Sequence, residues 1–457
     1  METMSDKLST FTANLRFEDI PSQVIEKVKL HVLDALGIAL ASTEEPYAEG
    51  IISLVRDWGG TPQATLWHHG DKLPAAHAAM ANGSLVHGID FDDTHTGSIT
   101  HVSACVVPTA IAVGEACAAN GREILAAMVA GYELIARVGG AMEGGFHAKG
   151  FHATPICGAF GAAAIAGRLW GHDPATIANA LGTVGSQASG IQEFLDDGSW
   201  AKRFHPGWAC HAGITATQLA GHGFIGPRKI FEGRFGLYAT HVQDAEYDPE
   251  ALAGGLGERW ETQNISFKPY PCCHFNHATM DAAKNLVRET GIALGNIDSI
   301  EAIIPEPIAH IVCEPIELKR KPNTSYAALF SLPYCVALAA AKGNATLDDF
   351  KEENLNDPEV LELAGKFSYA TVASDRFPRY LHGGVRMKLS DGRILEREEP
   401  INWGNPENPM EKKDVEEKFR RNAEHALPPD GIQRIIDAVA HLDEMASPAE
   451  LVSACCD

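Results

Sequence analysis

The sequence predicts a mostly helical α+β protein, in which a large helical domain is built from both ends of the chain and a smaller α+β lid domain is inserted into it. Three observations predict this. Residues 1–265 read mostly as helices, residues 266–400 mix strand and helix patterns, and residues 401–457 return to helix. The 457 residues are enough for two or three domains, at roughly 100–200 residues per domain.

Helices are expected through most of the first domain. Segment 21–41 begins with Pro21, which is favoured in the first turn of a helix, and its apolar residues recur at helical spacing. Segments 121–140 and 158–171 are helical and rich in alanine and glycine, and a further helix follows Asp173, a typical N-cap residue. Because small residues let helices approach closely, we expect a compact helical body.

The inserted domain has a mixed pattern. Segments 297–307 and 366–375 are typical of strands, and 385–398 alternates apolar and polar residues around an Asp391-Gly392 turn, which indicates a β-hairpin. Helical patterns lie between and after these strands, at 276–291, 325–343, 411–427 and 431–445. This order of elements is that of an α+β module followed by a helical return of the chain.

The composition excludes several classes of partner. The chain carries 37 basic and 60 acidic residues, a net charge of −23, so we expect neither nucleic acid nor an anionic membrane as a partner. No segment has the roughly 18 uncharged apolar residues of a membrane span. The N-terminal sequence lacks the apolar region of a signal peptide, and the cysteines show no CxxC spacing. We therefore expect a cytoplasmic protein with reduced thiols.

Segment 87–101, HGIDFDDTHTGSITH, is the most unusual stretch of the sequence. It holds three histidines and three aspartates between stretches of small, apolar residues. Three interpretations are open: metal ligands, groups that transfer protons, or a polar loop whose aspartates cap a helix. Histidine, lysine and tyrosine recur in four further segments, at His147 and His152, at 202–211, at 268–277, and at Tyr326 and Tyr334.

Two kinds of chemistry compete for these residues. The ligands of a metal hydrolase would be His87, Asp90, Asp92, His95 or His101. The HExxH, HxH and facial-triad spacings of such sites are absent. A cofactor-free acid–base site would instead pair an aspartate with a histidine, because the carboxylate fixes the imidazole tautomer and raises its basicity. Asp90 and His101 are our candidates for this pair. Glycine-rich nucleotide loops and GxSxG are absent too, so we expect neither a nucleotide cofactor nor serine-hydrolase chemistry.

Several motifs resemble the MmgE/PrpD family, and the resemblance covers nearly the whole chain. They are HGIDFDDTH, GFHATPICGAFGAAAIAGRLWG, KPYPCCHFNHATMDAA, LSDGR and GNPENPMEKKDVEEKF. Members of this family include 2-methylcitrate dehydratases, cis-aconitate decarboxylases and iminodisuccinate epimerases. The resemblance implies a helical domain built from both chain ends, an inserted α+β lid, a homodimer, and a site without metal or cofactor in the cleft between the domains.

The resemblance also implies a set of site residues, carried over motif by motif. The catalytic residues would be Asp90, His101, His152, Lys202 and Tyr334, and the substrate-binding residues Lys268 and His274. Two positions depart from the family pattern, since Val102 stands where many members have proline and His274 where many have arginine. A guanidinium binds a carboxylate through two parallel hydrogen bonds and an imidazole does not, so the second departure bears on substrate choice.

The predicted function is that of a cofactor-independent lyase acting on a small di- or tricarboxylate, with a 2-methylcitrate dehydratase of propionate metabolism as first choice. Elimination of water next to a carboxylate passes through an enolate-like anion, which Lys202, Lys268 and His274 would stabilise. Decarboxylation of cis-aconitate and epimerisation of iminodisuccinate use a similar anion and are alternatives. A non-catalytic member that only binds a carboxylate is an alternative of another class.

The predicted proton transfers involve both faces of the substrate. His101, oriented by Asp90, would be the base or the acid on one face, and His152 or Tyr334 would serve the other.

Overall fold

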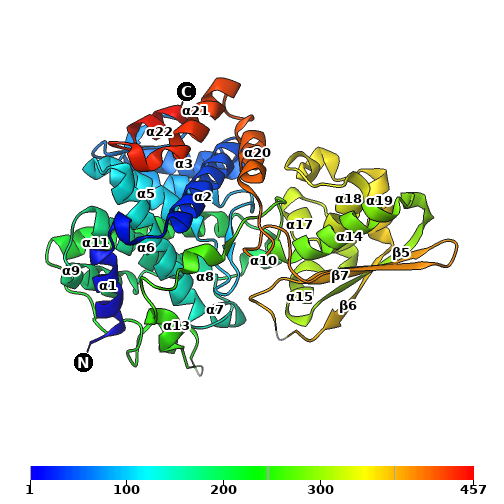
Figure 1. Cartoon of the computed structure of the whole chain (residues 1–457), viewed down its shortest axis with the longest axis horizontal. Coiled ribbons are helices and arrows are strands. Elements are labelled where there is room, and N and C mark those ends of the chain that lie inside the picture. Colours follow the sequence, from blue (N-terminus) through cyan, green and yellow to red (C-terminus); the bar gives the residue numbers. More distant parts are fainter. Residues whose placement is uncertain (1, 244–245, 375, 457) are drawn as a thin grey trace. The chain divides into compact units, whose positions relative to one another are not determined.

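A computed structural model describes residues 2–243, 246–374 and 376–456 (Figure 1). Its contacts divide the chain into two compact units. The first, here called the helical unit, comprises Met1–Ile265 and Glu411–Asp457, and the second, the α+β unit, comprises Ser266–Met410. Helices dominate the described residues and the main sheet has four strands, which confirms the predicted mostly helical α+β class.

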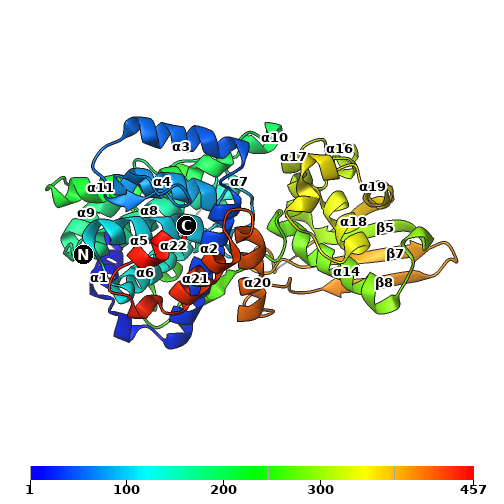
Figure 2. The same cartoon turned by 90° about the horizontal axis from the view of Figure 1, so that it is seen from above.

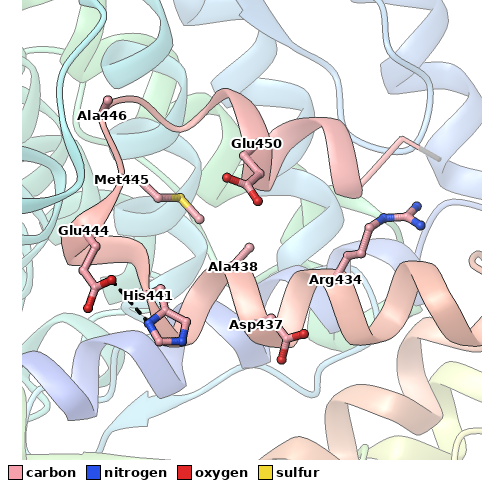
Figure 3. Close-up of a pocket in the computed structure, with 8 residues that line it drawn as sticks. All are labelled: Arg434, Asp437, Ala438, His441, Glu444, Met445, Ala446 and Glu450. Atoms are coloured by element: carbon pink, nitrogen blue, oxygen red, sulfur yellow. Dashed lines mark ion pairs between the residues drawn. The ribbon is translucent and has the colours of Figure 1, made fainter.

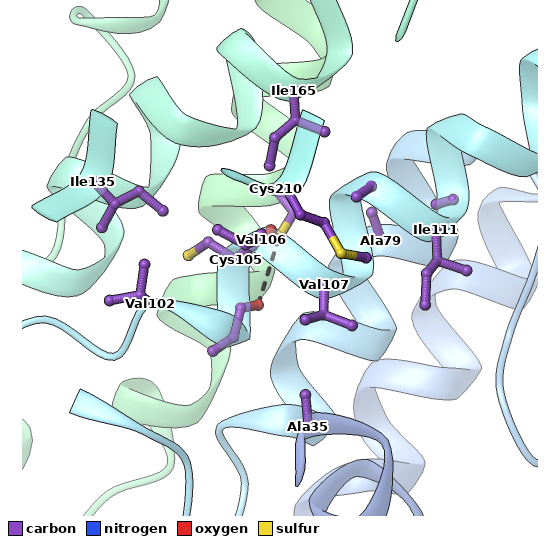
Figure 4. Packing of buried hydrophobic residues seen from close by; sticks show 14 of the residues in the cluster. Ala35, Ala79, Val102, Cys105, Val106, Val107, Ile111, Ile135, Ile165 and Cys210 are labelled. Carbon is purple, nitrogen blue, oxygen red and sulfur yellow. Dashed lines mark hydrogen bonds between the residues drawn. The ribbon is translucent and has the colours of Figure 1, made fainter. Parts of the chain in front are cut away.

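Five helices form the centre of the helical unit. They are α4 (Ala75–Val86), α5 (Ser103–Cys117), α6 (Gly121–Gly140), α8 (Ala153–Leu169) and α11 (Ala201–Gly221). Helix α11 packs on α8 and α4, α6 packs on α8, and α5 packs on α4 and α8. In Figure 4, apolar side chains of α5 lie among those of neighbouring helices, and Cys210 of α11 lies beside Cys105 of α5, with its Sγ 3.4 Å from Cys105 O. The helices expected at 121–140 and 158–171 are confirmed as α6 and most of α8.

Small residues bring these helices into close contact. A methyl group at Gly207 of α11 would overlap the carbonyl of Met80 and the hydroxyl of Ser84 on α4. A methyl group at Gly213 would overlap the backbone of α8. The alanine- and glycine-rich composition therefore has the packing consequence expected from the sequence.

Helices from both ends of the chain share this core. Helix α2 (Ser22–Ala41) packs on α20 (Lys412–Ala423) and on α21 (Pro429–Ala440), so the first and last thirds of the chain meet (Figure 1). The predicted N-cap Asp173 is confirmed, since its side chain accepts a hydrogen bond from Thr176 N in the first turn of α9 (Pro174–Val184). The remaining α-helices among the described residues of this unit are α1 (Met4–Asn14), α3 (Pro46–Trp58), α7 (Gly145–Ala148), α10 (Phe194–Asp197), α12 (Leu237–His241), α13 (Pro249–Ala253) and α22 (Ala449–Ala454). Its short strands include β1 (Ala64–Thr65), β2 (Lys72–Leu73) and β3 (Thr94–His95).

The sheet of the α+β unit has the strand order β6-β5-β7-β8. Strand β5 (Ile297–Pro305) pairs in parallel with β6 (Phe367–Val372) and antiparallel with β7 (Gly383–Leu389), and β7 forms a hairpin with β8 (Ile394–Glu399). The predicted strands and hairpin are thereby confirmed, although Asp375, the last residue of one expected strand, lies outside the described residues.

Helices cover this sheet. Helix α14 (His277–Thr290) packs across β7 and β8, and α18 (Leu332–Lys342) packs on α14 and α19 (Pro358–Gly365) (Figure 2). Two shorter helices, α15 (Ala309–Val312) and α16 (Ile316–Arg320), lie between α14 and α18 in the sequence.

The prediction of a single helix at 325–343 is wrong, because the chain forms two helices there. Helix α17 (Ser325–Leu329) ends before α18, whose N-cap Ser331 accepts a hydrogen bond from Tyr334 N. Pro333 stands in the first turn of α18. Proline lacks the N–H that a continuous helix would need at that point, so it begins a helix rather than continuing one.

Residues 401–410, which the sequence groups with the C-terminal helices, lie in the α+β unit. Trp403 N donates to Asp281 Oδ2 of α14 at 3.1 Å, and Phe267 N donates to Gly404 O at 3.0 Å. No helix among the described residues has both the length and the apolar character needed to cross a membrane.

Candidate functional site

The segment from His87 to His101 connects two central helices of the helical unit. Helix α4 ends at Val86 with His87 as its C-cap residue, and α5 begins at Ser103. Asp90 has a φ of 54° in the left-handed region, so the chain reverses direction there. The polar segment is buried, and Asp90, Asp92 and His87 are each less than 5% exposed.

Asp92 lies between two histidines. Its Oδ2 is 2.7 Å from Nδ1 of His87, which donates a hydrogen bond, and its Oδ1 is 3.2 Å from Nδ1 of His101. The second contact is electrostatic rather than an aligned hydrogen bond. The His101 side chain is 13% exposed whereas those of Asp92 and His87 are almost fully buried, so His101 is the most accessible member of this group.

The predicted pairing of Asp90 with His101 is wrong. Asp90 instead forms a buried ion pair with Lys202, which stands in the first turn of α11. Asp90 has a left-handed φ of 54°, and Asp92 rather than Asp90 lies beside His101. Asp92, two residues further along the chain, makes the carboxylate–imidazole contact with His101 that was expected of Asp90.

The third aspartate, Asp93, has a structural role that matches the helix-cap interpretation in part. Its Oδ1 accepts from Ser103 N, at the start of α5, at 3.0 Å, and its Oδ2 lies 2.7 Å from Nδ1 of His31 on α2. The Ser103 hydroxyl contacts both Asp93 and the hydroxyl of Tyr132. A carboxylate beside a helix N-terminus is stabilised by the unpaired N–H groups there.

His152 joins the group from another helix start. It is the N-cap residue of α8, and its Nδ1 lies 3.0 Å from Nδ1 of His205 on α11. Its ring stacks on that of His87 with centroids 5.6 Å apart. His101 N donates to Thr154 Oγ1, in the first turn of α8, at 3.0 Å. The structure therefore brings together four of the predicted residues, Asp90, His101, His152 and Lys202.

Burial shifts the pKa values of the buried side chains at this site. It lowers the pKa of His87 to about 4, although Asp92 opposes this shift. It also lowers the pKa of His152 well below its usual value. For Asp92, burial would raise the pKa, but the neighbouring His101 and His87 hold it well below its ordinary value. At neutral pH the site thus has a charged Asp92 carboxylate and neutral imidazoles at His87 and His152.

The segment is anchored from the far end of the sequence. Nζ of Lys418, on α20, donates to Phe91 O at 2.8 Å and lies 2.7 Å from Oδ1 of Asp34 on α2. Phe91 stands between Asp90 and Asp92, so this bond fixes the backbone that carries both carboxylates. Lys418 was not identified from the sequence. The pattern that could have indicated its role is its helical spacing from the buried apolar residues of α20.

Two other residues were missed as acid–base partners. Asp92 entered the sequence analysis only as a metal ligand, and His205 only as a member of a polar segment. No spacing rule distinguishes Asp92 from Asp90.

The remaining predicted residues belong to the α+β unit. The Lys268 side chain is fully buried. His274 is buried as well, and its Nε2 lies 2.9 Å from Nδ2 of Asn402. The Tyr334 hydroxyl donates to Asp349 O at 3.1 Å, and burial raises the pKa of Tyr334 above its ordinary value.

A surface pocket of about 490 Å³ lies in the C-terminal part of the helical unit, lined by α21, the following turn and α22 (Figure 3). His441 and Glu444 face each other there, with Nδ1 and Oε2 3.6 Å apart, and their side chains are 67% and 72% exposed. Exposed pairs of this kind contribute little free energy. The pocket contains none of the predicted residues, so we place the functional site at the His87–His101 segment.

Comparison with known proteins gives a family match over most of the chain. The models of the MmgE/PrpD N-terminal domain and of the MmgE/PrpD C-terminal domain match residues 6–250 and 270–444. The chain is 28% identical over 460 positions to cis-aconitate decarboxylase of Homo sapiens, covering 97% of this chain and 93% of that protein. It is 26% identical over 470 positions to cis-aconitate decarboxylase of Aspergillus terreus, covering 98% and 95%. It is 23% identical over 458 positions to a mitochondrial 2-methylcitrate dehydratase of Yarrowia lipolytica, covering 91% and 83%.

Proposed function

Because the chain belongs to the MmgE/PrpD family, we propose that it is a cofactor-independent lyase that acts on a small di- or tricarboxylate, at a carbon next to a carboxylate. The observation that carries this proposal is the placement of Asp92 between a buried histidine and the more accessible His101. A buried carboxylate orients the imidazole and stabilises its protonated form. His101 is thereby equipped to accept a proton from a substrate carbon or to return one.

The surroundings of His101 favour an anionic substrate. Lys202 supplies a buried positive charge in the first turn of α11. Helices α5, α8 and α11 begin beside the same group of residues, as the contacts His101–Thr154, His152–His205 and Asp90–Lys202 show. Helix N-termini carry partial positive charge and favour carboxylates. Charge that develops on a carboxylate-stabilised carbanion is therefore met by fixed positive groups.

We propose decarboxylation of a cis-aconitate-like tricarboxylate as the first reaction to test. The decarboxylases named above are more similar to this chain than the dehydratase is, and they align over more of it. In this reaction the bond to a carboxylate breaks, CO₂ leaves, and the electron pair remains on a carbon conjugated with another carboxylate. Protonated His101 would then deliver a proton to the anion, and His152 would serve the opposite face.

Dehydration of a 2-methylcitrate-like hydroxy acid is the second candidate, since the same groups suit it. His101 would remove the proton next to the carboxylate, and the hydroxide would leave with a proton from an acid on the other face. Lys268 and His274 stay proposed binding residues for substrate carboxylates, and Tyr334 a proposed acid. A cytoplasmic location and a homodimeric state are also proposals.

The test is incubation of the purified protein with cis-aconitate, 2-methylcitrate, citrate and iminodisuccinate in deuterated water, followed by NMR. Loss of CO₂, loss of water and deuterium exchange without net change distinguish decarboxylation, dehydration and epimerisation. Turnover of at least one of these acids supports the proposal. No change in any of them, at enzyme concentrations sufficient for single turnover, would contradict it.

A further inference from the structure

The histidines around Asp92 also form a set of potential metal ligands. One ring nitrogen from each of His87, His101 and His152 lies within 4.8 Å of the other two. The ring centroids of His87 and His101 are 4.7 Å apart. Three imidazole nitrogens this close to one another are a typical ligand set for Zn²⁺ and Co²⁺, whereas Mg²⁺ and Ca²⁺ prefer oxygen ligands.

The orientation of His87 is the second observation that points to a ligand. Its Nδ1 donates to Asp92 Oδ2 at 2.7 Å, so its Nε2 carries the lone pair. This Nε2 is buried and has no hydrogen-bond partner among the described residues, in a side chain that is 0% exposed. A buried acceptor without a partner costs free energy, which a bound cation would recover.

The position of Asp92 fits the same interpretation. Histidines that bind metal ions usually donate their other ring N–H to a carboxylate, which fixes the tautomer and strengthens the metal–nitrogen bond. Asp92 stands in this relation to His87 and contacts the corresponding nitrogen of His101. A carboxylate that orients an imidazole for proton transfer therefore also orients it for metal binding.

We propose that His87, His101 and His152 bind one divalent ion of the zinc type, with Asp92 as the outer carboxylate and a water molecule completing the coordination. Zinc–nitrogen bonds of about 2.0–2.1 Å require the three nitrogens to draw closer, by rotation of the rings. The bound ion inhibits the enzyme, because it occupies nitrogens of His101 and His152 that move protons. This inhibition rests on the proposed function, and the binding itself does not.

The binding experiment uses the full-length protein after dialysis against a chelator. Co²⁺ is added first, because its visible absorption reports nitrogen coordination of low symmetry, and Zn²⁺ is then measured by competition with a chromophoric chelator. We expect one equivalent of either ion to bind, with Zn²⁺ displacing Co²⁺ and with Mg²⁺ in excess leaving the Co²⁺ spectrum unchanged. An absence of Co²⁺ absorption, or a spectrum of octahedral oxygen coordination, would overturn the proposal.

Substitutions of single residues test which side chains bind the ion. His87→Gln should abolish stoichiometric binding, and Asp92→Asn should weaken it by about 10- to 100-fold, the range found for outer carboxylates. His441→Gln is the matched control, because His441 is an exposed histidine in the same unit and should leave the affinity unchanged. Thermal melts without metal establish that each variant is folded, and His152→Gln replaces His87→Gln if the latter does not fold. Equal Zn²⁺ affinity in the folded ligand variants and in the wild type would overturn the assignment.

An activity measurement separates this inference from the proposed function. In the wild type, Zn²⁺ should inhibit turnover over the concentration range in which it binds, and a chelator should restore the rate. Binding of Zn²⁺ by a protein without lyase activity would contradict the proposed function and leave the metal site standing. Full activity of the Zn²⁺-saturated protein would contradict the inhibition.

Discussion

At the scale of single residues, three neighbouring aspartates have three different partners. Asp90 pairs with Lys202, Asp92 contacts two histidines, and Asp93 accepts from the start of α5. The sequence predicts that this segment carries chemistry, because so many titratable groups between apolar stretches require partners. It does not predict which aspartate has which partner, because partners such as Lys202 and His31 come from distant parts of the sequence.

Lys202→Met should lower kcat/KM by about 100-fold or more, since one charged donor to a developing anion contributes about 3 kcal/mol. It should also lower the melting temperature, because the variant loses the buried ion pair of Lys202 with Asp90. The double variant Lys202→Met/Asp90→Asn should recover stability and stay inactive. Kinetics and thermal melts of the three proteins check this, and wild-type turnover in Lys202→Met would remove Lys202 from the site.

At the scale of elements, the site residues lie at the ends of helices. His87 closes α4, His152 opens α8 and Lys202 stands in the first turn of α11. The sequence predicts most of these helices from periodicity and from caps such as Asp173. It does not predict that α20 is anchored to the loop between α4 and α5, since Lys418 and Phe91 are far apart in the sequence.

Lys418→Met tests this anchoring. Breaking a buried ion pair with Asp34 should destabilise the protein by about 3–5 kcal/mol at neutral pH. Burial raises the pKa of Asp34 to about 6 even with Lys418 present, and removal of the lysine should raise it further. A carboxyl group whose pKa is higher in the folded protein than in the unfolded one contributes its full stabilisation at pH values below the ordinary pKa of 3.8. This contribution is lost as the pH rises through the pKa of the folded protein.

The variant should therefore lose more stability than the wild type as the pH rises from about 4 to about 7. Denaturant unfolding across this range measures the difference. Lys418→Met/Asp34→Asn is the control, because it removes the titrating group and should abolish the additional pH dependence. Equal pH dependence of Lys418→Met and the wild type would show that Asp34 does not depend on this lysine.

At the scale of the whole molecule, the two units differ in how much of their structure the sequence predicts. The α+β unit is predicted closely, because alternating strands and an Asp-Gly turn are local signals. One exception is the segment 325–343, which forms two helices instead of one. Residues 401–410 are another, since their place in that unit depends on distant contacts such as Trp403 with Asp281. Because the net charge is −23, the electrostatic field of the whole protein does not attract an anionic substrate. Binding of such a substrate therefore depends on positive groups close to the site.

A homodimer is expected in solution. Light scattering should give about twice the chain mass of 49.0 kDa at micromolar concentration. Large apolar side chains such as Ile225 and Phe235, which are 80% and 75% exposed, give the helical unit apolar surface that association would cover. A monomer mass at every concentration tested would contradict this expectation.

Activity should survive exhaustive chelation, because proton transfer by Asp92 and His101 needs no metal ion. The turnover rate is measured before and after dialysis against a strong chelator, with metal analysis of both samples. Unchanged or increased activity is expected. Activity that is lost with a stoichiometric metal and restored by its return would instead indicate a metal-dependent enzyme.

The claim that Asp92 and His101 act as one proton-transfer unit is tested most directly by a double-mutant cycle in kcat/KM. Asp92→Asn and His101→Ala should each lower activity strongly, and the double variant should be little worse than His101→Ala alone, because both changes disable the same group. The parallel cycle of Asp90→Asn with His101→Ala is the control and should be closer to additive, since Asp90 acts through Lys202. Strict additivity of the Asp92 and His101 losses, or full activity in folded Asp92→Asn, would contradict the account.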